Sequence, residues 1–192
     1  MEKKLAFGYL AAILIICLLA ILFGGFVIVF ASVLVLFEKC FFGRISIIPG
    51  IEFTTLATIL VTMKYGMLVG ILFVIFIPLV VPTIINAIIG ERGVINPNFQ
   101  FIGIGFGNFL DILCVIVISL LSKMDIIWVM LIILLLKHGA NFVVERIKGV
   151  TFSFSSIGIP INVLFNLSLV YFFHSFWTVS YTHLTLPTTE RV

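Results

Sequence analysis

Polar side chains recur at helical spacing in this otherwise apolar chain, and two such groups have the chemistry to hold a polar molecule. The first is led by Glu52, and threonines follow it at intervals of three or four residues, on one face of a helix. A carboxylate and hydroxyls together accept and donate hydrogen bonds. The alternative is packing alone, because threonines bond to carbonyls of their own helix and a glutamate in a first turn suits the helix dipole. The threonines of this face are Thr55, Thr58 and Thr62.

A second polar face begins at Lys137, which follows an apolar run over residues 126–136. Asn141, Glu145 and Lys148 continue it at intervals of three or four residues, so all four side chains share one side of a helix. The apolar run before Lys137 places this lysine deep in an apolar layer, buried or facing a cavity. The alternative is that the helix leaves the layer just before Lys137, whose ammonium then extends to the interface.

Asp111 is flanked on both sides by apolar residues, where an unpaired carboxylate is costly. Lys137 has the opposite charge and lies at a comparable depth, so we predict an ion pair between them. Asn162 and Asn166 share a face of the last apolar segment, and we expect them to form amide bonds between helices. The candidate substrate-binding residues are Glu52, Thr55, Asp111, Lys137 and Asn141.

The sequence contains no zinc-protease motif, no Ser/His/Asp or Cys/His arrangement and no phosphate-binding loop. We therefore predict no enzymatic activity, no catalytic residues, no metal and no cofactor. The cysteines at 17, 40 and 114 are scattered and are interpreted as small apolar fillers. The basic residues form no long run, and we expect no nucleic-acid partner.

Composition indicates a membrane protein. Of the 192 residues 62% are hydrophobic and 10% are charged, whereas soluble domains carry roughly 25% charged residues. The mean hydropathy is +1.37. Most of the exterior must therefore face the lipid bilayer, and we predict an all-α, multi-pass protein of a prokaryotic inner (plasma) membrane.

The apolar segments predict a polytopic bundle of about six transmembrane helices, at roughly 20 residues per span. The first apolar run is too long for one span and has Gly24-Gly25 near its middle, so either one tilted helix crosses or two segments do, which would make seven. Seven fits the distribution of basic residues better, but it needs two very short arms. The expected helices are 5–37, 51–65, 67–89, 101–122, 126–145 and 157–177.

The connections and close contacts are also predicted. Residues 38–46 are expected to form a loop, and prolines 78 and 82 are expected to kink the third helix. The small-residue pairs Gly66/Gly70 and Gly103/Gly107 indicate close helix contacts.

Residues 1–179 form a single predicted transmembrane domain. The polar segment 180–192 resembles a tail that follows many unrelated metagenome-derived proteins, where adaptor DNA has been translated. We interpret it as non-native, and the alternative is an ordinary polar C-terminal tail.

The stretch PGIEFTTLATILV from Pro49, followed by YGMLVGILF from Tyr65, resembles two related groups of membrane proteins. These are the substrate-binding (S) components of energy-coupling-factor transporters and the MreD-like rod-shape proteins. The resemblance covers residues 49–90 and the six-span layout. It implies a compact six-helix bundle, and in S components a small-residue face on the first helix docks a transmembrane coupling subunit. Gly8 and Ala12 can stand in for that face, although the alanine pair expected in the family is not clearly present.

Three functions compete at this point. A small-solute-binding transport subunit predicts that the candidate residues face a common interior cavity. A non-transporting, MreD-like scaffold, which would contact other membrane proteins, predicts a bundle without a cavity. An intramembrane enzyme would need a nucleophile or metal set, which the sequence does not supply.

Overall fold

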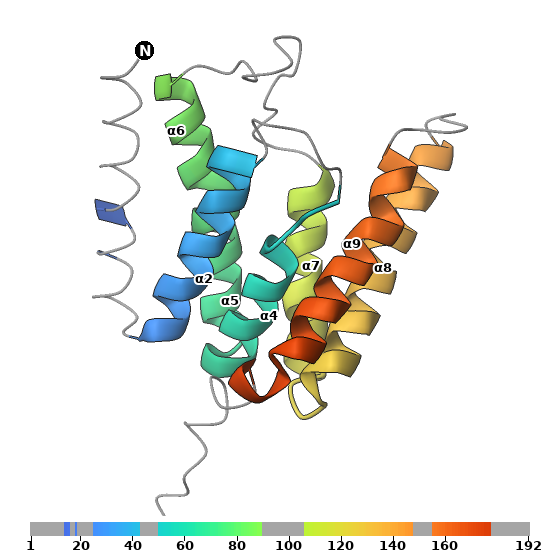
Figure 1. Ribbon diagram of the computed structural model, residues 1–192. Helices are drawn as coiled ribbons and strands as arrows, with labels where there is room; N and C mark the ends of the chain where they lie inside the picture. Colours follow the sequence, from blue (N-terminus) through green and yellow to red (C-terminus); the bar gives the residue numbers. More distant parts are fainter. Residues whose placement is uncertain are drawn as a thin grey trace, which may run out of the picture.

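The computed structural model describes residues 25–42, 50–89, 106–147 and 155–177, together with Leu14, Ile15 and Leu18. All regular structure in this part of the chain is helical, which confirms the all-α prediction (Figure 1). Two π-helical segments, Glu38–Phe42 and Ile75–Val80, adjoin the α-helices. The α-helices are α2 (Phe26–Phe37), α4 (Thr54–Tyr65), α5 (Met67–Val74), α6 (Val81–Ile89), α7 (Phe106–Leu120), α8 (Ile126–Ile147) and α9 (Ser155–Phe172).

The first predicted helix is broken at Gly25. This residue has φ +140°, a conformation that L side chains rarely adopt, and α2 begins directly after it. A Cβ atom on Gly25 would lie 2.2 Å from the Tyr65 hydroxyl oxygen, so the glycine also permits close contact with the end of α4. A single continuous helix over 5–37 is therefore wrong. Apart from Leu14, Ile15 and Leu18, the residues before Gly25 lie outside the described part.

The predicted loop at 38–46 is wrong in its first half. Glu38–Phe42 continues α2 as a π-helical turn, and the Glu38 N–H donates to the Leu34 and Val35 carbonyls. The remainder of that loop, 43–46, lies outside the described residues. Because the helix continues at Glu38, the side chain of this residue reaches the start of α4.

Helix α4 occupies the centre of the bundle, between α2, α5, α7 and α8 (Figure 1). Every side chain from Thr54 to Thr62 is buried. Its opposite faces join the two apolar clusters of the core: Ala57 and Val61 pack in one, while Leu56 and Ile59 pack in the other. Two of its buried threonines bond to carboxylates outside the helix, Thr54 to Glu38 and Thr55 to Glu52. Thr58 bonds within the helix, to the Thr54 carbonyl at 2.8 Å.

Gly66 separates α4 from α5, as expected from the predicted helices 51–65 and 67–89, and its φ of +86° allows the chain to reverse there. One turn later Gly70 is buried against α4 and α7: an added Cβ would lie 2.4 Å from the Thr62 hydroxyl oxygen. This confirms the predicted close contact for Gly70, whereas a Cβ on Gly66 would meet nothing within 4 Å. Gly107 has open space around it, and Gly103 lies outside the described residues.

The helix after Gly66 continues through its prolines. Pro78 lies inside the π-helical segment Ile75–Val80, where the lost N–H donor and the ring are accommodated by widening the turn. The sequence predicted that Pro78 would kink this helix. The structure has a π-helical segment at Pro78, and α6 follows it directly.

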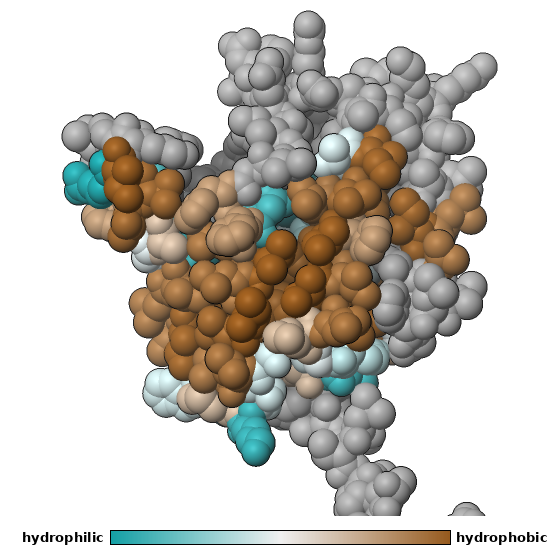
Figure 2. Space-filling view, turned by 180° about the vertical axis from the view of Figure 1, so that it is seen from behind, coloured by the Kyte–Doolittle hydropathy of each residue, from teal (hydrophilic) through white to brown (hydrophobic). Residues whose placement is uncertain are grey.

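Two of the described helical stretches are long and apolar enough to cross a membrane, Met67–Ile85 and Ile126–Ile147. Helices α7 and Gly158–Phe172 are apolar but shorter. Seen from behind, apolar residues form a broad band across the middle of the molecule, with hydrophilic residues below it (Figure 2). Large apolar side chains are also exposed on α7 and α8, among them Phe109, Leu120, Trp128 and Leu135.

Candidate functional site

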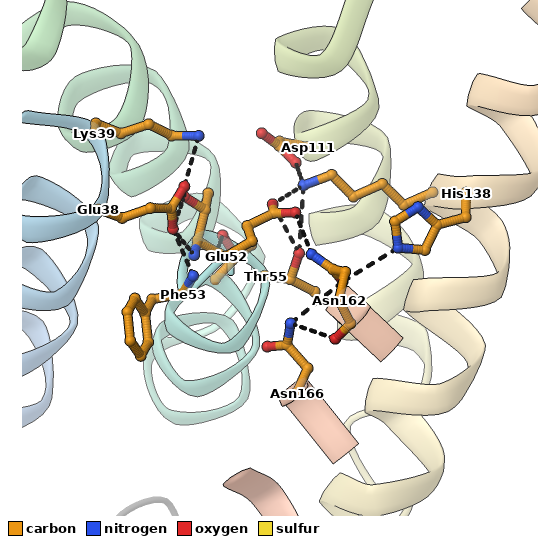
Figure 3. Close-up of polar contacts among 12 residues, drawn as sticks. Glu38, Lys39, Glu52, Phe53, Thr55, Asp111, His138, Asn162 and Asn166 are labelled. Carbon is orange, nitrogen blue, oxygen red and sulfur yellow. Dashed lines mark hydrogen bonds and ion pairs between the residues drawn. The ribbon is translucent and has the colours of Figure 1, made fainter. Parts of the chain in front are cut away.

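Lys137 stands at the centre of a buried ion cluster. It lies midway along α8 and is 7% exposed. Its ammonium nitrogen is 2.7 Å from an Asp111 oxygen and also contacts Oε1 of Glu52. The two carboxylates approach from α7 and from the segment before α4, so one lysine joins three parts of the bundle (Figure 3).

The structure confirms the predicted ion pair between Asp111 and Lys137. Helices α7 and α8 are joined by the short turn at 121–125, and both residues lie well inside their helices. They therefore reach the same depth on adjacent helices. Removing either charge would leave the other buried without full compensation, which gives the pair its structural importance.

Glu52 uses both carboxylate oxygens. Oε1 accepts from the Thr55 hydroxyl at 3.1 Å and from Lys137, and Oε2 accepts from Nδ2 of Asn162 at 3.1 Å. The Lys137 ammonium also donates to the Thr55 hydroxyl at 3.3 Å. A carboxylate with this many donors is held in one orientation.

The predicted place of Glu52 in the first turn of its helix is wrong. Helix α4 begins at Thr54, and the carboxylate at its start belongs to Glu38. Glu38 Oε2 accepts from the Phe53 N–H at 2.5 Å and the Thr54 N–H at 2.7 Å, and Lys39 lies 2.8 Å from its other oxygen. Because Glu38 satisfies the first N–H groups of α4, Glu52 turns to the bundle interior instead (Figure 3).

Helix α9 supplies two amides to the same network. Asn162 lies between Glu52 and His138, with its Oδ1 3.2 Å from Nε2 of His138. Asn166 donates to the Asn162 carbonyl at 3.1 Å. The expected amide bonding between helices is therefore confirmed for Asn162, whose Oδ1 on α9 contacts His138 on α8. The position of Asn162 beside the ion cluster was not predicted from the sequence, and neither was the contact made by His138. The only signal for His138 was its position next to Lys137.

A cavity of about 340 Å³ lies beside this network, between α8, the start of α9 and the segment before α4. Gly50 allows this segment to approach α9, because a Cβ there would lie 2.3 Å from the Gly158 carbonyl oxygen. The lining residues are Gly50, Glu52, His138, Asn141, Phe142, Glu145, Gly158, Ile159 and Asn162.

The predicted binding residues divide around the ion cluster. Glu52 and Asn141 line the cavity. Thr55 and Asp111 instead border a small gap that has no room for a water molecule. Lys137 joins the two sides, since it contacts both Glu52 and Asp111. Four of these residues thus form one network, but they do not share one cavity.

The charges of this region do not cancel. Glu38 and Lys39 pair with each other, whereas Lys137 is shared by two carboxylates. The cluster of Glu52, Asp111 and Lys137 therefore carries a net charge of −1 when all three are ionised. Of these three side chains, Glu52 is the one that lines the cavity.

Comparison of the chain with protein-family models, curated proteins and solved structures gives no match. Within the described residues, no three His, Cys, Asp or Glu side chains gather as metal ligands. The site offers hydrogen-bond donors and acceptors beside a buried ion cluster. This arrangement can hold a small polar molecule.

Proposed function

We propose that this chain is a multi-pass membrane protein of about six spans that binds a small solute, as a transport subunit similar to S components does. The observation that carries the proposal is the cavity of about 340 Å³ beside Glu52 and Asn162. Its volume falls at the low end of the range of ligand pockets, roughly 300–1,000 Å³. Its wall combines carboxylates, amides and an imidazole with the apolar Phe142 and Ile159.

A lipid environment is supported by the exposed apolar side chains. Leu120 and Ile147 are each 79% exposed, and two helical stretches have the length and composition of spans. Such a surface would associate in water, whereas acyl chains cover it without cost. We place the protein in the inner (plasma) membrane of a prokaryote, with its ion cluster facing inward.

The competing proposal is an MreD-like scaffold, in which polar residues serve only helix contacts. Thr58 and Asn166 are consistent with a scaffold, since each bonds to the backbone of its own helix and neither lines the 340 Å³ cavity. A scaffold does not require a cavity lined by polar side chains, whereas a solute-binding protein does. For that reason we favour the solute-binding function. A transmembrane coupling subunit would be the partner of an S-component-like protein. The docking candidates Gly8 and Ala12 lie outside the described residues.

The direct test is to purify the protein in mild detergent and identify bound small molecules by mass spectrometry. Asn141→Trp places a bulky side chain on the cavity wall and should reduce the bound molecule at least tenfold. Gly139→Ala is the matched control on the same helix, because an added Cβ there meets nothing within 4 Å. It should retain the molecule.

Both variants should elute and melt as the unchanged protein does, which separates lost binding from lost folding. A preparation that carries no bound molecule, or one whose bound molecule is unaffected by Asn141→Trp, would contradict solute binding at this cavity. A pull-down from membranes then distinguishes the two functions further. A transport subunit should recover a coupling subunit, whereas a scaffold should not.

A further inference from the structure

We infer that the solute is a small organic cation, such as a protonated amine, which binds Glu52 while Asp111 retains Lys137. This inference rests on the proposed solute-binding function and specifies the ligand of the same cavity. Three observations carry it: the charge of the cavity wall, the sharing of Lys137 and the size of the cavity.

The described cavity wall favours a positive charge. Its ionisable side chains are the carboxylates of Glu52 and Glu145 and the imidazole of His138. Among the described lining residues there is no lysine or arginine. Lys137 is held behind Glu52 by its contacts to Glu52 and Asp111. An anionic solute would meet like charge at this wall, which opposes its binding.

The sharing of Lys137 makes Glu52 available to a ligand. A buried ammonium needs a counter-ion, and here it has two. When a cation binds Glu52, Lys137 keeps its 2.7 Å contact to Asp111 and does not become unpaired. The bound cation also offsets the surplus negative charge of the three-residue cluster. Asp111 is thus a positioning residue that acts through Lys137 and does not touch the solute.

The geometry distinguishes the two carboxylates. Glu52 lines the cavity and is 18% exposed, whereas Asp111 is 13% exposed and borders the closed gap. Oε2 of Glu52 lies on the side of Asn162, which itself contacts His138 (Figure 3). A cation entering the cavity therefore reaches Glu52 and not Asp111, and the amide oxygens of the cavity wall can accept its remaining hydrogens.

The cavity volume limits the ligand to a small molecule. About 340 Å³, at the low end of the range of ligand pockets, suits a short alkylamine. Phe142 and Ile159 provide apolar contact for an alkyl chain opposite the polar groups.

The test uses three probes of similar size that differ in charge: n-butylammonium, n-butanol and n-butyrate. Their binding to the whole protein in nanodiscs is measured by isothermal titration calorimetry in phosphate buffer at neutral pH. We expect n-butylammonium to bind at least tenfold more tightly than n-butanol, and n-butyrate to bind least. Equal or tighter binding of n-butanol or n-butyrate would overturn the inference.

Two variants test the roles of the carboxylates. Glu52→Gln should abolish the preference for n-butylammonium over n-butanol. Asp111→Asn should weaken n-butylammonium about tenfold and leave n-butanol unchanged, because Lys137 then competes for Glu52 without an alternative partner. A purely structural role for Asp111 would weaken both probes equally. Asp111→Glu restores the charge and should recover the preference, and Gly139→Ala is the neutral control on α8.

The results separate this inference from the proposed function. Binding of the neutral or anionic probe that is lost in Asn141→Trp would retain solute binding and reject the cation. If no probe binds, the molecule identified by mass spectrometry decides: a cation supports the inference, and a neutral or anionic molecule overturns it. If there is neither a binding probe nor a co-purified molecule, the proposed function itself fails.

Discussion

The ammonium nitrogen of Lys137 lies 2.7 Å from the Asp111 carboxylate, and the same nitrogen contacts Glu52. One side chain from α8 therefore connects α7 with the segment that leads into α4. Because these charges are withdrawn from solvent, each depends on the others for compensation. This dependence leads to the first prediction.

Lys137→Met should destabilise the protein strongly, because Glu52 and Asp111 would face each other without a cation. Breaking a buried ion pair costs about 3–5 kcal/mol in general. Denaturant titration of the detergent-solubilised protein measures the loss. Lys123→Met, in the exposed turn between α7 and α8, is the control and should change stability by less than about 0.5 kcal/mol. Equal midpoints for the two variants would contradict the assignment.

A charge swap refines this test. Asp111→Lys with Lys137→Asp restores the Asp111–Lys137 pair in reverse, but it sets a carboxylate beside Glu52. We therefore expect the swap to recover only part of the stability that each single change loses. Adding Glu52→Gln should recover more, since it removes the like charge. No recovery in either combination would contradict the pairing.

Glu38→Ala should destabilise the start of α4, because the Phe53 and Thr54 N–H groups lose their acceptor. Loss of a helix cap costs about 0.5–2 kcal/mol, and charge-assisted bonds lie at the upper end. Glu38→Gln retains an acceptor oxygen and should cost less. The unfolding midpoints of the two variants provide the measurement, and the reverse order would show that capping is not the role of Glu38.

Gly70→Ala should destabilise the contact of α5 with α4 and α7, whereas Gly107→Ala should not. A Cβ on Gly70 would lie 2.4 Å from the Thr62 hydroxyl oxygen and 2.9 Å from a Val115 methyl carbon. Overpacking of this kind costs about 1–3 kcal/mol. A Cβ on Gly107 meets nothing within 4 Å, so alanine there should be neutral or favourable by up to about 1 kcal/mol.

Thr62→Ala should relieve the clash in the Gly70→Ala background. The Thr62 hydroxyl is buried without a partner, so its removal costs little by itself. Melting temperatures of the single and double variants in the same detergent form a double-mutant cycle. Purely additive effects would show that the two positions do not meet.

Asp125 should make stability depend on pH at the end of the bundle. Burial acts to raise the pKa of Asp125, but the Ile127 N–H and the His174 side chain outweigh it and hold the pKa below its ordinary value of 3.8. A lowered carboxyl pKa contributes stability that is present above the ordinary value and is lost as pH falls through the folded value. The contribution should therefore disappear below about pH 3.8.

Asp125→Asn is the informative variant, because asparagine also accepts from the Ile127 N–H, which Asp125 does at 2.9 Å. It should be less stable than the unchanged protein at pH 6, and the difference should shrink as pH falls below 3.8. The effect is expected to be small, since both Asp125 and His174 are more than a third exposed. A difference that grows on acidification would have the wrong sign for this mechanism.

Local patterns in the sequence were sufficient for most of the helices, but not for the π-helical segment Glu38–Phe42 or the start of α4 at Thr54. The apolar run from 126 gave the helix Ile126–Ile147, and Gly66 marked the reversal between α4 and α5, because hydrophobicity and glycine conformation act over a few residues. The Asp111–Lys137 pair was also predictable, since few opposite charges exist at that depth and each needs a partner.

Packing alone decided the rest of the site. Glu52 meets Lys137 across 85 residues and Asn162 across 110, and no periodicity links positions so far apart. Whether Glu38 or Glu52 would cap α4 depended on how far α2 continued beyond Phe37. The sequence by itself determined where most of the helices lie and that Asp111 and Lys137, deep in apolar runs, need partners. Only the tertiary structure decided which charges meet and which of them face the cavity, because these depend on the relative placement of whole helices.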